Sequence, residues 1–336
     1  LQGRESIAGG YMENDYLFIQ FAGFTFGKAV SQFDPQWALG KPTISSGFLA
    51  GSNNATGIAQ LAYTAQFGNG VSGTISLEDA QPYRTAGVVN ASVMTGSGFI
   101  SPFLAATVNY GVASANSFTG NASGGDHVPD IVGNLRVDQA WGSLHFGAAA
   151  HEVHGTYYTT NGSGAVDGNG RPASTWGYAV TGAFELKNLP TGVGDSLKAE
   201  ATFSHGAAKY TFGGTVDTAG AGRFAKLGSG TGNTGQSIGF GYVLDGVYAN
   251  GTNISLANAW DVSAYYEHYW TPAWRTSIFG SVSAISYGST GNSLLVAAAN
   301  GGFLTTGSTG SFKGTAVDTG NNFNLTLSQI GTKTAW

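Results

Sequence analysis

The stretch NAWDVSAYYEHYWTPAWRTSIFGSVSAISY, residues 258–287, decides the fold because two runs of alternating polar and apolar residues meet at a Thr-Pro turn. The even positions of the first run are apolar or aromatic: Trp260, Val262, Ala264, Tyr266, His268 and Trp270. Polar residues such as Asp261 and Glu267 stand between them. Because successive side chains of a strand point to opposite faces, the pattern predicts two strands that each carry one uncharged face.

The length and the ends of these runs indicate what the uncharged face contacts. Each run has about ten residues or more, which is the length that a tilted strand needs to cross the hydrocarbon core of a bilayer. The second run continues the apolar face with Trp274, Ile278 and Val282. Aromatic residues at the ends with small apolar residues between them are typical of strands that face lipid.

The composition also favours a chain that contacts a lipid bilayer. Charged residues make up 10% of the 336 residues, against about 25% in ordinary soluble domains. Hydrophobic residues nevertheless reach only 42%, and no run of about 20 apolar residues predicts a membrane-spanning helix. With 54 glycines and many Ser, Thr and Asn residues, the sequence predicts an all-β chain of strands and turns.

Several functional classes are disfavoured by what the sequence contains. A chain with no cysteine has no disulfide framework, thiol catalysis or cysteine-based zinc site. The net charge of -5 and the lack of a Lys/Arg cluster argue against a nucleic-acid partner. No G-x-S-x-G or triad-like set occurs, and the G-x-G-x-x-G match at 230–235 lacks a preceding apolar strand. We therefore expect neither an enzyme nor a cofactor.

A group of histidines raises the question of a metal site. His145, His151 and His154 lie close in sequence to Glu152. Strand alternation separates His145 and His151 from Glu152 and His154, whereas metal ligands have to converge. The sequence therefore predicts solvated residues at these positions and no metal site.

The strand signals describe a meander of hairpins. Strands are expected at 16–22, 24–30, 58–67, 71–79, 129–141, 143–153, 176–187, 196–204, at both sides of the 271–272 turn within 258–287, and at 321–336. The connections alternate between short turns, such as the Asn-Gly turn at 68–70, and long loops, such as 31–57 and 205–257. In an antiparallel meander this places every long loop at one end, as in outer-membrane barrels.

Specific motifs add a family resemblance. The segments FIQFAGFTFGKAVSQFD (18–34), LAYTAQFGNGVSGTISLED (61–79) and PDIVGNLRVDQAWGSLHFGAAAHEV (129–153) resemble the alphaproteobacterial outer-membrane porins of the rhizobial and Brucella type. WGYAVTGAFELKNLP (176–190) and the stretch after 265 continue the resemblance in the same order, so that it covers nearly the whole chain.

The resemblance implies a single antiparallel transmembrane β-barrel domain over 1–336, of a type with about 16 strands, assembled as a homotrimer in the outer membrane of a Gram-negative cell. It implies passive diffusion of small hydrophilic solutes and ions through a water-filled channel. In that family, the loop that here spans 31–57 folds inward and narrows the channel. Aligned with the family pattern, the chain is expected to be a fragment of about 11 to 12 strands that lacks the first two to three strands and the last two.

For such a channel, selectivity comes from the radius and the charges at the narrowest point. We expect these charges on the 31–57 loop, at its base and on the inward faces of the strands: Lys28, Asp34, Lys41, Arg136, Asp138, Lys198, Glu200, Glu267 and Arg275. The alternative from another class is a secreted β-rich adhesin or passenger-type domain, built as a soluble solenoid. The sequence shows no constant repeat of 20 to 50 residues that would favour it.

Overall fold

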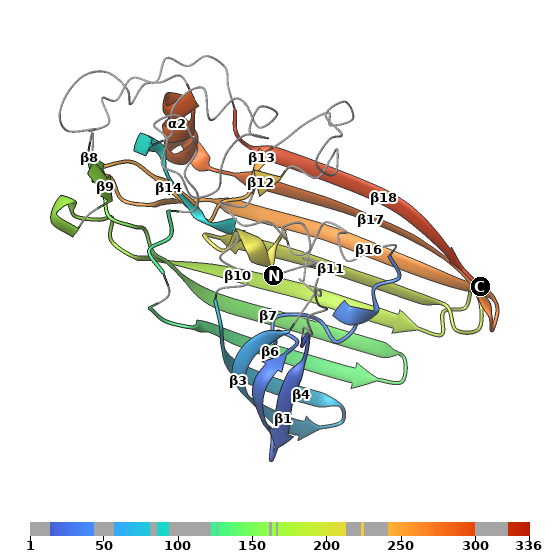
Figure 1. Ribbon diagram of the computed structural model, residues 1–336. Helices are drawn as coiled ribbons and strands as arrows, with labels where there is room; N and C mark the ends of the chain where they lie inside the picture. The colour runs from blue at the N-terminus through green and yellow to red at the C-terminus, as the bar shows by residue number, and fades with distance from the viewer. Residues whose placement is uncertain are drawn as a thin grey trace, which may run out of the picture.

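The computed structural model describes residues 14–43, 57–80, 86–93, 122–125, 127–160, 163–165, 167–212, 223–224, 241–299 and 322–336. Most of these residues belong to one 11-stranded sheet with the order β1-β2-β3-β4-β6-β7-β10-β11-β16-β17-β18. Neighbouring strands in this order follow one another along the chain and pair antiparallel. The predicted meander and the predicted all-β class are therefore confirmed. The sheet is curved but not closed, with β1 and β18 at its two edges (Figure 1).

The strands of the large sheet are β1 Leu17–Phe21, β2 Phe24–Ala29, β3 Ile58–Gly68, β4 Val71–Glu78, β6 Asp130–Gln139, β7 Gly142–Val153, β10 Thr175–Lys187, β11 Ser196–His205, β16 Asn258–Thr271, β17 Trp274–Ser286 and β18 Leu325–Ala335. Shorter strands lie in the connections: β5 Val88–Asn90, β8 Thr159–Thr160, β9 Ser163–Ala165, β12 Arg223–Phe224, β13 Gly241–Tyr242, β14 Gly246–Tyr248 and β15 Ser255–Leu256. The helical elements are η1 Ala38–Gly40, η3 Ala91–Val93, η5 Asp167–Asn169, η6 Ala208–Tyr210 and α2 Gly288–Ala299.

Short turns and long connections alternate along the sheet, as the sequence predicts. The short turns join β1 to β2, β3 to β4, β6 to β7, β10 to β11 and β16 to β17, and Figure 1 shows β8, β9 and α2 of the long connections at the opposite end. At the β3–β4 turn, Asn69 and Gly70 have φ angles of 50° and 72°. Positive φ at both central residues is what a tight type I′ hairpin turn requires. A β-carbon on Gly70 would stand 1.9 Å from the Asp138 carbonyl oxygen, so no other residue fits there.

The two faces of the sheet differ as the alternation predicts. On β16, Trp260, Val262 and Ala264 are exposed, whereas Asp261 and Ser263 are buried. We call the exposed, mostly apolar face the outer face and the opposite face, which carries the buried polar residues, the inner face. The large apolar residues exposed on the outer face include Phe24, Phe26, Leu61, Tyr63, Ile75, Leu77, Leu135, Phe146, Tyr178, Val180, Ile278 and Val282.

Strand β18 departs from this pattern. The sequence groups Phe323, Leu325 and Leu327 on one face, and elsewhere in the sheet the apolar face points outward. Here Leu325 pairs with Ile285 and Leu327 with Ser283, both of which point inward, so the leucines lie on the inner face. They turn inward because an apolar cluster covers the sheet at that position, and Phe323 and Leu325 pack against this cluster.

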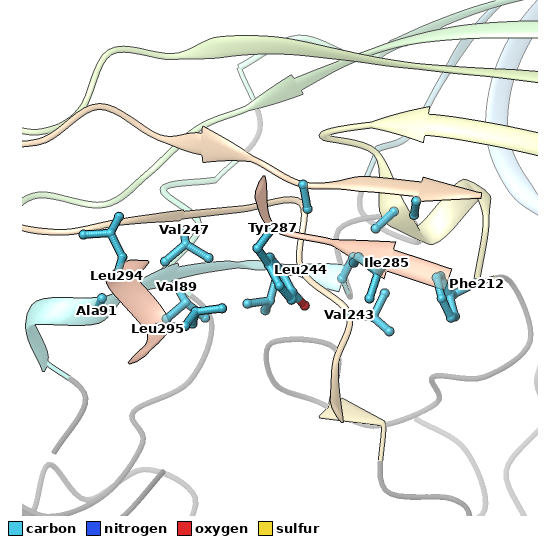
Figure 2. Packing of buried hydrophobic residues seen from close by; sticks show 14 of the residues in the cluster. Val89, Ala91, Phe212, Val243, Leu244, Val247, Ile285, Tyr287, Leu294 and Leu295 are labelled. Carbon is cyan, nitrogen blue, oxygen red and sulfur yellow. The ribbon is translucent and has the colours of Figure 1, made fainter. Parts of the chain in front are cut away.

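The long connections contain folded structure that the sequence does not predict. Strand β14 pairs antiparallel with β15, which follows it closely in the chain. It also pairs parallel with β5, and this second pairing joins segments about 160 residues apart. Together with η3 and α2, these strands bury an apolar cluster that extends onto the inner face of β16–β18, and we call this unit the cap. Figure 2 shows Leu294 and Leu295 of α2 beside Val89 and Val247, with Tyr287 and Ile285 beyond them. The long connection that follows β17 therefore begins with a helix.

Two further expectations can be compared with the fold. Antiparallel pairing of consecutive strands does not fit stacked solenoid coils, which argues against the adhesin alternative. None of the helices in the described ranges combines the length and the apolar character needed to cross a bilayer. The glycine-rich match at 230–235 lies outside the described residues.

Candidate functional site: a segment across the inner face

The chain between β2 and β3 turns back over the inner face of the sheet. Residues 30–43 of this connection are described, and the remainder of the predicted 31–57 loop, residues 44–56, lies outside the described residues. We call residues 30–43 the crossing segment. Its contacts run from Glu78 on β4 to Ser277 on β17 and Lys333 on β18, so that it spans nearly the full width of the sheet. Figure 1 shows the part that carries η1 in front of the central strands.

The first anchor of the crossing segment is Glu78, the last residue of β4. Ser31 donates its hydroxyl to Glu78 Oε2 at 2.6 Å, and the backbone N–H of Gln32 donates to Oε1 at 2.8 Å. Ser76 donates a third hydrogen bond to the same carboxylate. Glu78 is fully buried, and its hydrogen bonds to the segment offset the cost of removing a carboxylate from water.

The middle of the crossing segment lies on β6 and β7. Asn134 donates to the Gln32 carbonyl at 2.5 Å, and the Phe33 carbonyl lies 2.8 Å from His145 Nε2. Arg136 Nη2 donates to the Asp34 carbonyl at 3.3 Å. Backbone carbonyls of the segment thus find partners among wall side chains instead of water. These hydrogen bonds give the backbone polar groups of an irregular stretch of chain the partners that they need away from bulk solvent.

The Asp34 side chain is buried and its two carboxylate oxygens make no hydrogen bond within the described residues. Burial raises the pKa of Asp34 well above its ordinary value. Lys41 and Arg136 oppose this increase, and the carboxylates of Glu200 and Glu78 add to it. Asp34 is therefore the group of the segment that is most sensitive to pH.

The far end of the crossing segment is held by an ion pair. Lys41 Nζ lies 2.8 Å from Glu200 Oε1 on β11, and the two side chains are only 5% and 1% exposed. Burial by itself lowers the pKa of Lys41, but the Glu200 carboxylate more than offsets that effect and holds it above the ordinary value. The ammonium also lies 5.7 Å from the centre of the Tyr265 ring, which adds a cation–π contact.

Aromatic contacts fix the segment between these polar anchors. Phe33 meets Tyr210 edge-on with the ring centroids 4.6 Å apart, and Trp37 meets Tyr265 at 5.8 Å. Both pairs belong to small buried clusters on the inner face, one with Val132 of β6 and the other with Ala183 of β10. The crossing segment is thus docked by packing as well as by hydrogen bonds.

Six of the nine residues expected at a constriction surround the crossing segment. Asp34 and Lys41 belong to it, and Arg136 and Glu200 contact it as described. Asp138 accepts a hydrogen bond from Gln36 at 3.2 Å, and Lys198 lies 3.5 Å from the Gly40 carbonyl and 3.4 Å from Glu185. The sequence reasoning did not choose Glu78, Gln32 or Asn134 as site residues, although strand alternation had placed Glu78 on the inward face.

The other three expected residues lie away from this group. Lys28 shares a strand face with Phe24 and Phe26, the outer face, and donates to the Asn14 carbonyl at 2.9 Å. It was expected at the base of the loop because it is near in sequence, but strand alternation turns it away. Glu267 and Arg275 form a separate pair at the short-turn end, 3.5 Å apart and beside Tyr269.

The histidines of β7 have different surroundings. His145 contacts the crossing segment, whereas His151 Nδ1 lies 2.7 Å from Asp130 Oδ1 and connects the sheet to the long connections. Tyr210 donates to the other oxygen of Asp130 at 2.6 Å, and Asp245 lies 3.7 Å from His151 Nε2. Near the end of β7, Glu152 and His154 converge with His127, a residue that the sequence reasoning did not consider as a ligand.

Comparison with known proteins identifies the family of this chain. A model of the porin subfamily matches residues 2–336. Among solved structures, the outer membrane channel DcaP of Acinetobacter baumannii aligns with 83% of this chain at 12% identity and a TM-score of 0.49. This chain spans 58% of the length of that channel chain. A search of curated proteins found no match. The match over nearly every residue shows that the chain belongs to the porin subfamily.

Proposed function

We propose that the curved sheet forms the wall of a water-filled channel and that the crossing segment narrows this channel. The observation that carries the proposal is the position of the crossing segment, which lies on the polar inner face and is anchored from β4 to β18. A segment in that position takes up cross-section that a solute would otherwise use. The apolar outer face supplies the surface that contacts hydrocarbon.

The charges around the segment set the character of the narrow zone. Lys41, Arg136 and Lys198 lie beside the acidic residues Asp34, Glu185 and Glu200 on the inner face. Opposed acidic and basic groups produce a transverse field that orders water and disfavours apolar solutes. We infer that the substrates are small hydrophilic solutes and ions that pass without a catalytic step, and the net charge of -5 favours cations weakly.

The oligomeric state and the source are part of the same proposal. The resemblance of the 18–34 and 129–153 motifs to rhizobial and Brucella porins supports a homotrimer from an alphaproteobacterium. The outer face of β18 carries Thr326, Ser328, Thr332 and Thr334 around a single large apolar residue, Ile330, and this mostly polar face suits contact with protein better than contact with lipid. Chemical crosslinking of the full-length protein in membranes tests this: trimer bands are expected, and monomer alone contradicts it.

The channel is tested by cysteine modification, because the native chain has no cysteine and therefore no background reaction. Leu39 of η1 is 51% exposed, in contrast to the buried Ala38 beside it. In planar bilayers, coupling a bulky cationic thiol reagent to full-length Leu39→Cys is expected to reduce the single-channel current. The matched control is Val193→Cys on the β10–β11 turn, which is 96% exposed and lies far from the crossing segment.

Three outcomes of this experiment are informative. A reduced current at Leu39→Cys with an unchanged current at Val193→Cys supports the proposal. Equal effects at the two positions contradict the placement of the segment in the channel. Absence of conductance steps from the full-length protein, with the protein inserted in the bilayer, contradicts the channel itself.

A further inference from the structure

A group of potential metal ligands lies at the long-connection end of β7, outside the site described above. His127 precedes β6, Glu152 is the penultimate residue of β7, and His154 follows that strand. His127 Nδ1 lies 3.7 Å from Glu152 Oε2, and the rings of His127 and His154 have centroids 3.9 Å apart. One ligand atom from each of the three side chains lies within 4.8 Å of the other two.

We propose that His127, Glu152 and His154 bind a divalent transition-metal ion of the Zn²⁺ class. Two imidazole nitrogens and one carboxylate oxygen are preferred ligands of such ions, and three protein ligands leave a fourth position for water. With metal–ligand distances of about 2.1 Å, tetrahedral ligands stand about 3.4 Å apart. The 3.7 Å contact is close to this spacing, and ligand atoms that lie up to 4.8 Å apart have to approach by at most about 1.4 Å.

The surroundings of His154 suit this role. Ser174 Oγ lies 2.7 Å from Nδ1, and such a partner fixes the ring and leaves the other nitrogen to face a metal. A small cavity lined in part by Ser123, Glu152 and His154 lies beside the group.

A positively charged neighbour competes for the same position. Arg171 Nη1 lies 3.2 Å from His154 Nε2. A metal ion and a guanidinium repel each other, so binding of the ion displaces Arg171. The guanidinium already lies 5.6 Å from the centre of the Tyr157 ring, a contact that it can keep when it leaves His154. The arrangement thus predicts that removing the charge of Arg171 strengthens metal binding.

The position of the ligands indicates what the ion does to the fold. His127 belongs to the connection that enters β6, and Glu152 and His154 belong to the strand end beside it. A shared ion ties this connection to the wall at the end where the long connections gather. The inference does not depend on the channel proposal, since a bound ion is measured without any transport.

The test uses the full-length protein without a histidine tag, purified in detergent. Calorimetric titration with Zn²⁺ is expected to show one ion bound per chain, whereas Mg²⁺ is expected not to bind. His127→Ala and Glu152→Gln are each expected to weaken Zn²⁺ binding by about tenfold or more, and Arg171→Gln to strengthen it several-fold. His205→Ala is the control, because His205 lies on β11 beside Asn258, away from the group.

A second readout identifies the ligands directly. Co²⁺ in place of Zn²⁺ is expected to give the intense visible absorption of a four-coordinate site, which His127→Ala abolishes. His127 is about half exposed, so its replacement does not threaten folding, and an unchanged heat-induced mobility shift in gels checks this. The inference is overturned if neither the native protein nor Arg171→Gln binds Zn²⁺. It is also overturned if His127→Ala binds Zn²⁺ as tightly as the native protein.

Discussion

Lys41 Nζ lies 2.8 Å from Glu200 Oε1, although 159 residues separate the two in sequence and both side chains are buried. This pair fixes the far end of the crossing segment to β11, and Ser263 on β16 donates to the same carboxylate oxygen at 3.2 Å. A buried ion pair contributes little net stability compared with apolar residues, but leaving one partner alone is costly. The position of the crossing segment therefore depends on both residues being present.

The first prediction concerns this pair. Lys41→Met leaves Glu200 buried without its cation and is expected to weaken docking of the segment by about 3 to 5 kcal/mol. Ala38 of η1 is completely buried while the segment is docked on the wall. In an Ala38→Cys background, adding Lys41→Met is therefore expected to accelerate labelling of the cysteine by a thiol reagent about a hundredfold or more.

Two comparisons make this result specific. Adding Glu200→Leu to Lys41→Met removes the unpaired charge and is expected to restore most of the protection. Glu267→Gln breaks the partly exposed pair with Arg275 and is expected to change the labelling rate less than about fivefold. Protection that survives Lys41→Met would contradict the role of the pair.

The second prediction concerns pH. Burial raises the pKa of Asp34, so the docked segment binds this proton more tightly than the undocked one. By linkage, docking is expected to strengthen as pH falls from the raised pKa towards the ordinary value of about 4, and to weaken as pH rises. Labelling of Ala38→Cys, corrected for ionisation of the cysteine thiol, is expected to slow on acidification. Asp34→Asn is expected to remove this dependence, and an equally strong one in that variant would exclude Asp34 as its origin.

The third prediction concerns Asp195, whose stabilising effect is lost as pH falls, whereas that of Asp34 is lost as pH rises. Asp195, on the β10–β11 turn, is buried, which opposes ionisation, but hydrogen bonds from His268, Thr191, the Tyr269 N–H and Tyr266 hold its pKa below the ordinary value. Its contribution to stability is therefore present at neutral pH and lost as pH falls below about 4. Thermal unfolding of Asp195→Asn is expected at a lower temperature at pH 7, with a smaller further decrease in acid. Asp167→Asn, exposed in η5, is expected to behave as the native chain.

The fourth prediction tests the cap. Leu295 of α2 is completely buried in the apolar cluster that Figure 2 shows, and Leu295→Ala is expected to destabilise the cap by about 2 to 5 kcal/mol. Hydrogen exchange measured by mass spectrometry is expected to accelerate in β5, β14 and α2 while β10 and β11 stay protected. Leu39→Ala, at an exposed position, is the control and is expected to change stability by less than about 0.5 kcal/mol. Equal acceleration in the strands would mean that the cap and the sheet unfold together.

The strands and turns of the large sheet could be predicted from local sequence. Alternation on β16 and β17 gives the face of each side chain, and turns such as Asn69-Gly70 need residues that accept positive φ, so the strand limits agree within a few residues. The cap could not be predicted, because the pairing of β5 with β14 is parallel and joins distant segments. Neither segment carries a period that indicates its partner.

The candidate site was predictable only in part, because alternation gives the face of a side chain but not its distant partner. Alternation places Arg136 and Glu200 on the inner face, but it does not say which of them a distant segment contacts. Lys28 was misplaced because closeness in sequence to the loop was given more weight than alternation. Glu78 was not chosen because a buried carboxylate bound by Ser31 and a backbone N–H has no sequence signature beyond its inward position. His127 was missed because its distance in sequence from Glu152 hides their contact.

The central claim is that the outer face contacts hydrocarbon and the inner face does not. Nitroxide scanning of β16 in lipid bilayers, with oxygen and a water-soluble nickel complex as relaxation agents, tests it most directly. We predict that oxygen accessibility peaks at positions 260, 262 and 264 and falls at 261, 263 and 265, where Asp261, Ser263 and Tyr265 are buried on the inner face. Oxygen accessibility that peaks at the odd positions, or that shows no period of two, would contradict the account.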